Sequence, residues 1–193
     1  MDMFYKYFLF VSLMLYFIGF ILKNVSTKIR TGQAITGNSI KLKMISITTP
    51  LLYLLIGTNI TKGADLLFRV NWLDYGIIRI IGLIFVSISL ILGFISLITM
   101  RDSWRVGIRT EQKTDLITNG VFRFSRNPYF LSYILIFLGC FLIIPTYVFL
   151  IVYLIWIILI HLMILDEEKY LIDQHDDIYR DYKRRVNRYL TIK

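Results

Sequence analysis

Two acidic residues, Glu167 and Glu168, stand at the end of a long uncharged segment. Negative charge is disfavoured at the C-terminal end of a helix, and a carboxylate at membrane depth commonly faces a cavity and pairs with a cation. Two interpretations fit this spacing. Either the acids begin a solvated tail and pair with Lys169, Arg184 or Arg185, or at least one of them binds a cationic group of a ligand.

A second polar stretch, residues 103–126, is long for a connection and leads into the sequence Arg126-Asn127-Pro128. It holds glycine and asparagine turn formers, a tryptophan and many hydrogen-bond donors. Irregular backbone near a membrane is tolerated where it is buried in protein or lines a cavity. We therefore expect this stretch to take part in a binding site.

The segments that position these residues are strongly apolar, since 56% of the 193 residues are hydrophobic. One soluble core of this size could not bury them, so lipid must be the solvent. A membrane-spanning helix needs about 20 residues. Four segments lack Asp, Glu, Lys and Arg, namely residues 7–22, 44–61, 80–100 and 127–165.

The last uncharged segment is long enough for two spans, and it is divided near Gly139 to Pro145, where proline favours a turn. The sequence thus predicts an all-α membrane protein of about five transmembrane helices, with spans four and five forming a tight helical hairpin. We expect one membrane domain over residues 1–193, with three N-terminal spans in residues 1–100.

Lysine and arginine gather in three segments, with five in residues 23–43, six in residues 101–126 and seven in residues 166–193. The positive-inside rule then places the N-terminus outside and the C-terminus in the cytoplasm. Membrane topology and anionic lipid explain the net charge of +9 without nucleic acid as a partner.

The chain beyond Glu168 predicts an amphipathic helix at the cytoplasmic surface, because its apolar residues recur at roughly helical spacing. These residues are Tyr170, Leu171, Ile172, Ile178, Tyr179, Tyr182 and Val186. Neither the single cysteine, Cys140, nor the acidic and histidine residues at 173–177 match a metal-ligand spacing, so we expect no metal site.

The order of these motifs resembles the isoprenylcysteine carboxyl methyltransferases and the related phospholipid and small-molecule methyltransferases of membranes. Those enzymes carry a glycine-aromatic loop leading to Arg-His-Pro-x-Tyr, then a helical hairpin, a Glu-Glu pair, and Tyr-x-x-Tyr followed by arginine. The resemblance covers about the last 90 residues. The matching residues are Leu116, Ile117, Gly120, Phe122, Arg126, Asn127, Pro128, Tyr129, Phe130, Glu167, Glu168, Tyr179, Tyr182 and Arg188.

The chain departs from this family pattern at three places. The family histidine is Asn127, which keeps hydrogen-bonding capacity but loses a titratable base. The motif tyrosine falls on Phe130, with Tyr129 one place earlier. The Phe-Gly that often follows the acids is His175-Asp176.

The resemblance implies a methyltransferase-like core in residues 101–193 that binds S-adenosylmethionine beside the cytoplasmic leaflet. In this interpretation Glu167 pairs with the cofactor's ammonium, while Arg126 and Asn127 address its carboxylate. The remaining implied cofactor-binding residues are Leu116, Ile117, Gly120, Phe122 and Tyr129.

The resemblance also implies two catalytic residues and a lipophilic methyl acceptor, with an isoprenylcysteine-type carboxylate as the family-based expectation. Arg188 would orient such a carboxylate. If the acceptor were an amine or a thiol, a proton would have to leave, and Glu168 or His161 would be the candidate base.

Two other functions stay open from the sequence. Membrane sterol and steroid reductases carry a similar Ser-Arg-x-Pro-x-Tyr segment and bind a nicotinamide cofactor, and Ser125 and Arg126 resemble that segment. A non-catalytic membrane lipid-binding or assembly protein, in which the acids are only surface charges, is the third interpretation.

Overall fold

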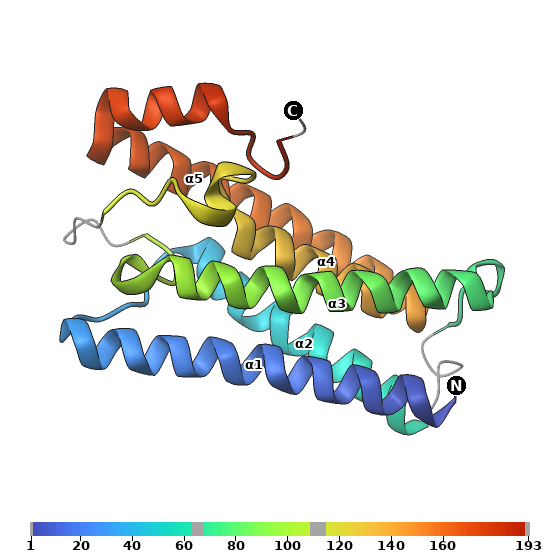
Figure 1. Ribbon diagram of the computed structural model, residues 1–193. Helices are drawn as coiled ribbons and strands as arrows, with labels where there is room; N and C mark the ends of the chain where they lie inside the picture. The colour runs from blue at the N-terminus through green and yellow to red at the C-terminus, as the bar shows by residue number, and fades with distance from the viewer. Residues whose placement is uncertain (1, 63–67, 109–114, 192–193) are drawn as a thin grey trace.

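The computed structural model describes residues 2–62, 68–108 and 115–191, which form helices and no strand (Figure 1). The α-helices are α1 (Met3–Thr31), α2 (Ile40–Lys62), α3 (Gly76–Thr99), α4 (Pro128–Ile143) and α5 (Tyr147–Arg185). The short 3-10 helices are η2 (Asn71–Leu73), η3 (Arg101–Ser103) and η4 (Gly120–Arg123). The predicted all-α fold is confirmed for these ranges.

Four of the described helices, α1, α2, α3 and α5, are long and apolar enough to cross a membrane. The fourth predicted span is wrong in length, because α4 has only 16 residues. Such a helix is about 24 Å long, which is less than the roughly 30 Å of a bilayer's apolar core. Proline limits α4 at both ends, because the helix starts at Pro128 and Pro145 lies in the turn that follows it.

The predicted helical hairpin is present, and α4 is held closely against α3. Glycine allows the approach: a Cβ atom on Gly82 would lie 2.8 Å from the Gly139 carbonyl oxygen, and one on Gly139 would lie 2.7 Å from the Gly82 carbonyl oxygen. Close contact through small residues is how membrane helices gain packing energy without a hydrophobic driving force.

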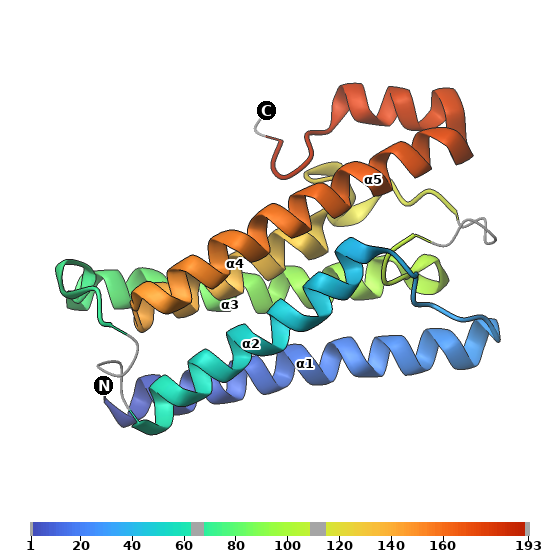
Figure 2. The same ribbon diagram turned by 180° about the vertical axis from the view of Figure 1, so that it is seen from behind.

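The helices form two layers, one made by α1 and α3 and the other by α2 and α5. Helix α1 packs against α3, and both face the viewer in Figure 1. Helix α2 packs against α5 on the opposite side, which faces the viewer in Figure 2. The core between the layers is rich in aromatic rings, among them Trp156, Phe137 and Phe149, which are fully buried.

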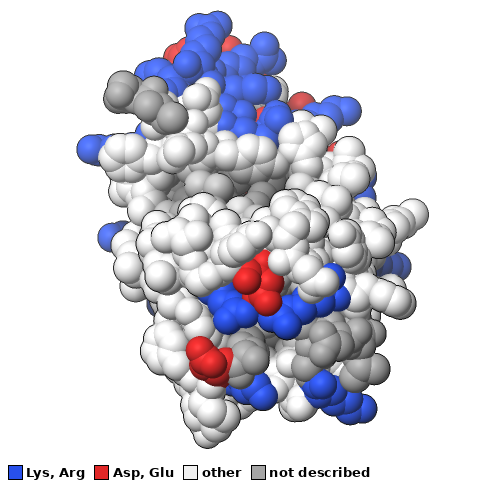
Figure 3. All heavy atoms as spheres, turned by 90° about the vertical axis from the view of Figure 1, so that its right-hand side faces the viewer, with Lys and Arg blue, Asp and Glu red and all other residues white. Residues whose placement is uncertain are grey.

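Segments predicted to share one side of the membrane do meet at one end of the molecule. The backbone of Val106 exchanges hydrogen bonds with Ile35 and Gly37, at 2.9 and 2.8 Å, and Arg30 pairs with Asp102 at 2.9 Å. At the opposite end Asp74 pairs with Arg69 and Arg79, and Figure 3 shows small charged groups there among uncharged side chains. Which end is cytoplasmic stays a prediction.

Helix α5 runs beyond its apolar part and then folds back. Its backbone leaves helical geometry at Asp176, where φ is 44° and ψ is −123°, and the last turns reverse over the turns that come just before this break (Figure 1). The predicted apolar face is confirmed in part: Tyr179, Tyr182 and Val186 are buried together, whereas Ile178, predicted to share this face, is 70% exposed beyond the break at Asp176. This face packs on Leu116 and neighbouring parts of α5, so the segment covers the loop before η4.

Candidate functional site

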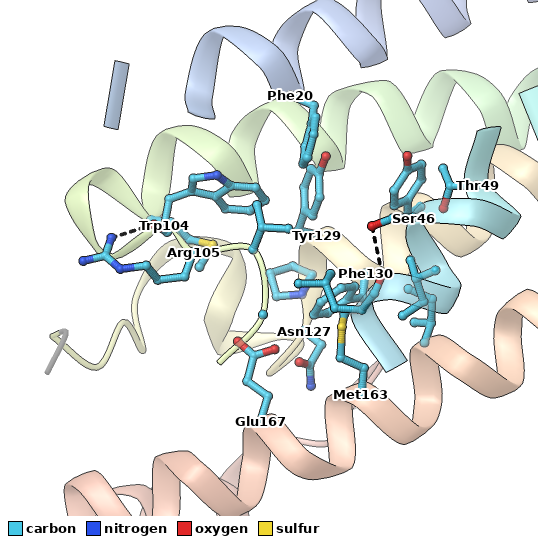
Figure 4. A pocket seen from close by; sticks show the side chains of 18 of the residues that line it. Phe20, Ser46, Thr49, Trp104, Arg105, Asn127, Tyr129, Phe130, Met163 and Glu167 are labelled. Atoms are coloured by element: carbon cyan, nitrogen blue, oxygen red, sulfur yellow. Dashed lines mark hydrogen bonds between the residues drawn. The ribbon is translucent and has the colours of Figure 1, made fainter. Parts of the chain in front are cut away.

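A cavity of about 720 Å³ opens between α1, α2, α4, α5 and the loop that precedes η4. This volume lies within the range of small-molecule and cofactor sites. The side chains in Figure 4 come from all of these elements, with Glu167 pointing inward from α5 and Asn127 and Tyr129 from the start of α4. Two distant parts of the chain thus form one site.

Most of the residues predicted to bind the cofactor line this cavity, and three predicted site residues do not. The lining includes Leu116, Ile117, Phe122, Arg126, Asn127, Tyr129 and Glu167. Gly120, Glu168 and Arg188 are outside it. Gly120 begins η4 with a φ of 56°, which favours glycine, and so shapes the backbone that carries Phe122.

Glu168 is instead the centre of a buried ionic network. Its Oε1 accepts hydrogen bonds from Arg126 Nη2 at 2.7 Å and Arg188 Nε at 3.0 Å, and its Oε2 accepts one from Arg188 Nη2 at 2.9 Å. The Glu168 and Arg126 side chains are 4% and 6% exposed. Lys183 lies further out, with Nζ 3.9 Å from Oε2. The network fixes both arginines rather than presenting a free carboxylate.

The same network holds the C-terminal segment over the cavity. Arg126 donates through Nη1 to the Val186 carbonyl, and its backbone N–H donates to the Asn187 carbonyl at 3.0 Å. The side-chain amide of Asn127 donates to the Arg188 carbonyl at 3.3 Å. The residue that replaces the family histidine therefore ties the start of α4 to the tail.

The two neighbouring acids have opposite electrostatic environments at the polar end of α5, beyond its apolar part. Burial opposes ionisation of Glu168, but hydrogen bonds and charge from Arg188 and Arg126 outweigh it and hold its pKa below the usual range. For Glu167, burial and the adjacent Glu168 charge raise the pKa to about 7. Glu167 has no hydrogen-bond or ion-pair partner within the ranges that the structure describes.

His161, the other candidate base, is also engaged elsewhere. Its Nδ1 lies 2.8 Å from the Tyr189 hydroxyl, and it does not line the cavity. The tyrosine next to Arg188 is thus anchored to α5. In the described part of the chain, no group of His, Cys, Asp and Glu side chains is arranged to hold a metal ion.

The other half of the cavity is apolar, is formed by α1 and α2, and was not predicted from the sequence. Its walls are Phe10, Leu13, Met14, Phe17 and Phe20 of α1, and Leu42, Ile45, Ser46, Thr49, Pro50, Tyr53, Ile56, Gly57 and Ile60 of α2. We call this half the apolar arm. Its only sequence signal is that Pro50 and Gly57, which favour helix poorly, stand inside a span.

The structure thus gives a helical membrane protein whose single cavity joins a charged end to an apolar arm. The family model for phospholipid methyltransferase matches residues 77–178, more than half of the chain. The chain belongs to this family. No curated protein sequence matches it.

Family membership makes the chain a membrane methyltransferase that uses S-adenosylmethionine, as the resemblance implied. It decides against the reductase and non-catalytic interpretations and implies a lipid acceptor. The match covers α4 and most of α5, whereas α1, α2 and Arg188 lie outside it.

Proposed function

We propose that this protein transfers a methyl group from S-adenosylmethionine to the polar head of a membrane lipid whose chain occupies the apolar arm. One observation carries the proposal: a single cavity contains both the unpaired carboxylate of Glu167 and the apolar walls of α1 and α2. The two substrates of such a reaction differ in the same way, because one is charged and water-soluble and the other is largely hydrocarbon.

The charged end of the cavity fits the cofactor. Glu167 lines it without a protein partner, so its carboxylate is available for the cofactor's ammonium. Asn127 and the backbone near Leu116 and Ile117 offer polar groups beside it, and Phe122 offers an apolar wall. When bound, S-adenosylmethionine supplies an electrophilic methyl group on a sulfonium.

The ionic network acts on this end indirectly. Glu168 holds Arg126 and Arg188, and these hold the C-terminal segment that covers the cavity. We therefore assign Glu168 and Arg188 a positioning role, although the resemblance implied direct catalytic roles. Exclusion of water and orientation of the reactants are major parts of catalysis in a group transfer of this kind.

The apolar arm is open to the lipid phase between α1 and α2. Phe10, Met14 and Phe17 line the cavity and are still 56%, 43% and 46% exposed, so they form its lipid-facing rim. The lining of α2 extends over the 19 residues from Leu42 to Ile60, about 27 Å of helix, which exceeds one leaflet of a roughly 30 Å apolar core. A lipid chain fits this length.

We favour an amine head group as the methyl acceptor. With Glu167 assigned to the cofactor, Asp115 is the second carboxylate on the cavity wall, whereas the guanidinium groups of Arg105 and Arg126 donate to other protein groups. As the amine nitrogen bonds to the methyl carbon and the carbon–sulfur bond breaks, the nitrogen loses a proton, and we assign Asp115 as the group that accepts it. An isoprenylcysteine-type carboxylate, which the resemblance implied, is the second candidate, because Arg126 still lies on the cavity wall.

The acceptor is tested with purified protein, S-adenosylmethionine labelled in its methyl group, and membrane lipids separated by class. We expect label in an amine-bearing phospholipid, where mild alkali leaves the labelled methyl on the involatile head group. Release of the label as volatile methanol would identify a methyl ester and the second candidate. Label only in water-soluble compounds would refute a lipid acceptor.

The role of the apolar arm is tested with Gly57→Leu. Gly57 lines the cavity, and a Cβ atom added there meets no atom within 4 Å, so a larger side chain can be introduced at this position of the arm. Methylation of lipid should fall while binding of S-adenosylhomocysteine is retained. Gly76→Leu is the matched control, because Gly76 is equally unobstructed and does not line the cavity. Equal activity in the two variants would contradict the assignment.

A further inference from the structure

The apolar arm follows one face of each of its two helices. Its lining residues recur at helical spacing from Leu42 to Ile60 on α2 and from Phe10 to Phe20 on α1. The start of α1 and the end of α2 lie near each other at one end of the molecule (Figures 1 and 2). Phe10 and Ile60 therefore mark the far end of the arm, away from the charged groups.

This far end lies about one leaflet of hydrocarbon beyond the polar groups. Lys41 Nζ is 2.5 Å from Asp166 Oδ2, which sets the start of α2 level with Glu167 on α5. Ser46 lies about 8 Å further along α2, roughly the depth of one head-group layer. Gly57 follows Ser46 by 11 residues, or about 16 Å of helix, and one leaflet of the apolar core is about 15 Å thick. An acyl chain that starts level with Ser46 thus reaches Gly57.

Gly57 differs from the other glycines inside the described membrane helices. A Cβ atom on any of those would lie 2.7–2.9 Å from an atom of a neighbouring helix, as for Gly19, Gly82, Gly93 and Gly139. A Cβ atom on Gly57 would meet no atom within 4 Å, although Gly57 lines the cavity. Glycine weakens a helix, and no close helix packing compensates for that here. The space at Gly57 is therefore available to a ligand.

We propose that the far part of an acyl chain of the acceptor lipid occupies the space at Gly57. The arm then selects lipids whose chains are about one leaflet long, and Gly57 is a specificity-determining residue for chain length. A full-length chain that starts level with Ser46 passes Gly57 and ends near Ile60, whereas a chain of about half that length ends near Tyr53. This inference rests on the proposed lipid acceptor.

The experiment compares dioleoyl phosphatidylethanolamine with didecanoyl phosphatidylethanolamine, which has the same head and much shorter chains. Methyl transfer to each lipid, in the same mixed detergent micelles, is measured with the wild type, Gly57→Leu and Ser46→Leu. Ser46 lines the cavity where chains of both lengths pass, so it is the matched control on the same helix. Stabilisation by S-adenosylhomocysteine shows that each variant is folded.

The wild type should prefer the dioleoyl lipid, because its longer chain makes more van der Waals contacts with the arm. Gly57→Leu should lower kcat/KM for the dioleoyl lipid at least about fivefold, because the leucine and the chain overfill the site. Its kcat/KM for the didecanoyl lipid should be unchanged, whereas Ser46→Leu should lower kcat/KM for both lipids.

Equal use of the two lipids by the wild type, or an equal loss on both in Gly57→Leu, would overturn the inference while leaving a lipid acceptor intact. Transfer to neither lipid by the wild type would refute both the amine phospholipid proposal and this inference.

A second measurement tests whether the space at Gly57 is unused by the protein itself. Gly57→Ala adds one methyl group that meets no atom, and alanine favours helix more than glycine does. The melting temperature of the lipid-free protein should therefore stay the same or rise. A lower melting temperature would show that position 57 packs against the protein and would overturn the inference.

Discussion

Replacing Glu168 and Glu167 separately with glutamine should give opposite results, although the two acids are adjacent. Glu168→Gln removes a carboxylate that is 4% exposed and receives hydrogen bonds from Arg126 and Arg188. The amide has one acceptor oxygen in place of two, and its NH₂ group faces guanidinium donors. Arg126, itself 6% exposed, loses its compensating charge.

Removing one partner from a buried ion pair destabilises a protein by about 3–5 kcal/mol. For a chain of this length that corresponds to a melting temperature roughly 6–20 °C lower. Glu167→Gln is the matched control, because Glu167 has no protein partner, and it should leave the melting temperature of the cofactor-free protein nearly unchanged.

Both proteins are assayed in one detergent by melting temperature, with and without S-adenosylhomocysteine. Glu167→Gln should lose most of the stabilisation that this ligand gives, since its carboxylate binds the ligand's ammonium in our proposal. Equal melting temperatures for the two cofactor-free variants would refute the ionic network. Full ligand stabilisation of Glu167→Gln would refute the cofactor assignment.

Three further predictions follow from single positions. The pKa of Glu167 is raised to about 7, and only its ionised form attracts an ammonium. The affinity for S-adenosylhomocysteine, measured by titration calorimetry, should therefore fall about tenfold from about pH 8 to about pH 6. Glu167→Gln should abolish this pH dependence. Asp176→Gly should raise the melting temperature by an amount equivalent to about 1 kcal/mol, because aspartate is strained at a φ of 44°, and a lower melting temperature would contradict this. Gly139→Ala should destabilise the protein by about 1–3 kcal/mol, because its Cβ atom would lie 2.7 Å from the Gly82 carbonyl oxygen, whereas Gly76→Ala, which meets no atom within 4 Å, should cost much less.

The sequence predicted the site best where a residue type is rare in its surroundings. Charge in an otherwise apolar chain marked Glu167, Glu168 and Arg126, and proline marked the hairpin turn. Uncharged runs also predicted the helices, but they overestimated α4, since a run of uncharged residues includes the turn as well as the helix.

The sequence could not predict which of Glu167 and Glu168 faces the cavity and which pairs with the arginines, because this depends on the rotation of α5 about its axis. Adjacent residues on a helix point about 100° apart, so one faces the cavity and the other faces the arginines. The apolar arm was missed for a different reason. Its walls, such as Phe17 and Tyr53, are ordinary residues for a span, and only the separation of α1 from α2 makes them a binding surface.

The most direct test of the account is mass spectrometry of lipids after the purified protein has been incubated with methyl-labelled S-adenosylmethionine and membrane lipid. The account predicts labelled methyl on the amine of a phospholipid, with the yield reduced by Gly57→Leu and unaffected by Gly76→Leu. Label on no lipid, or the same yield from the wild type and Gly57→Leu, would contradict the claim that the cavity joins the cofactor to a lipid.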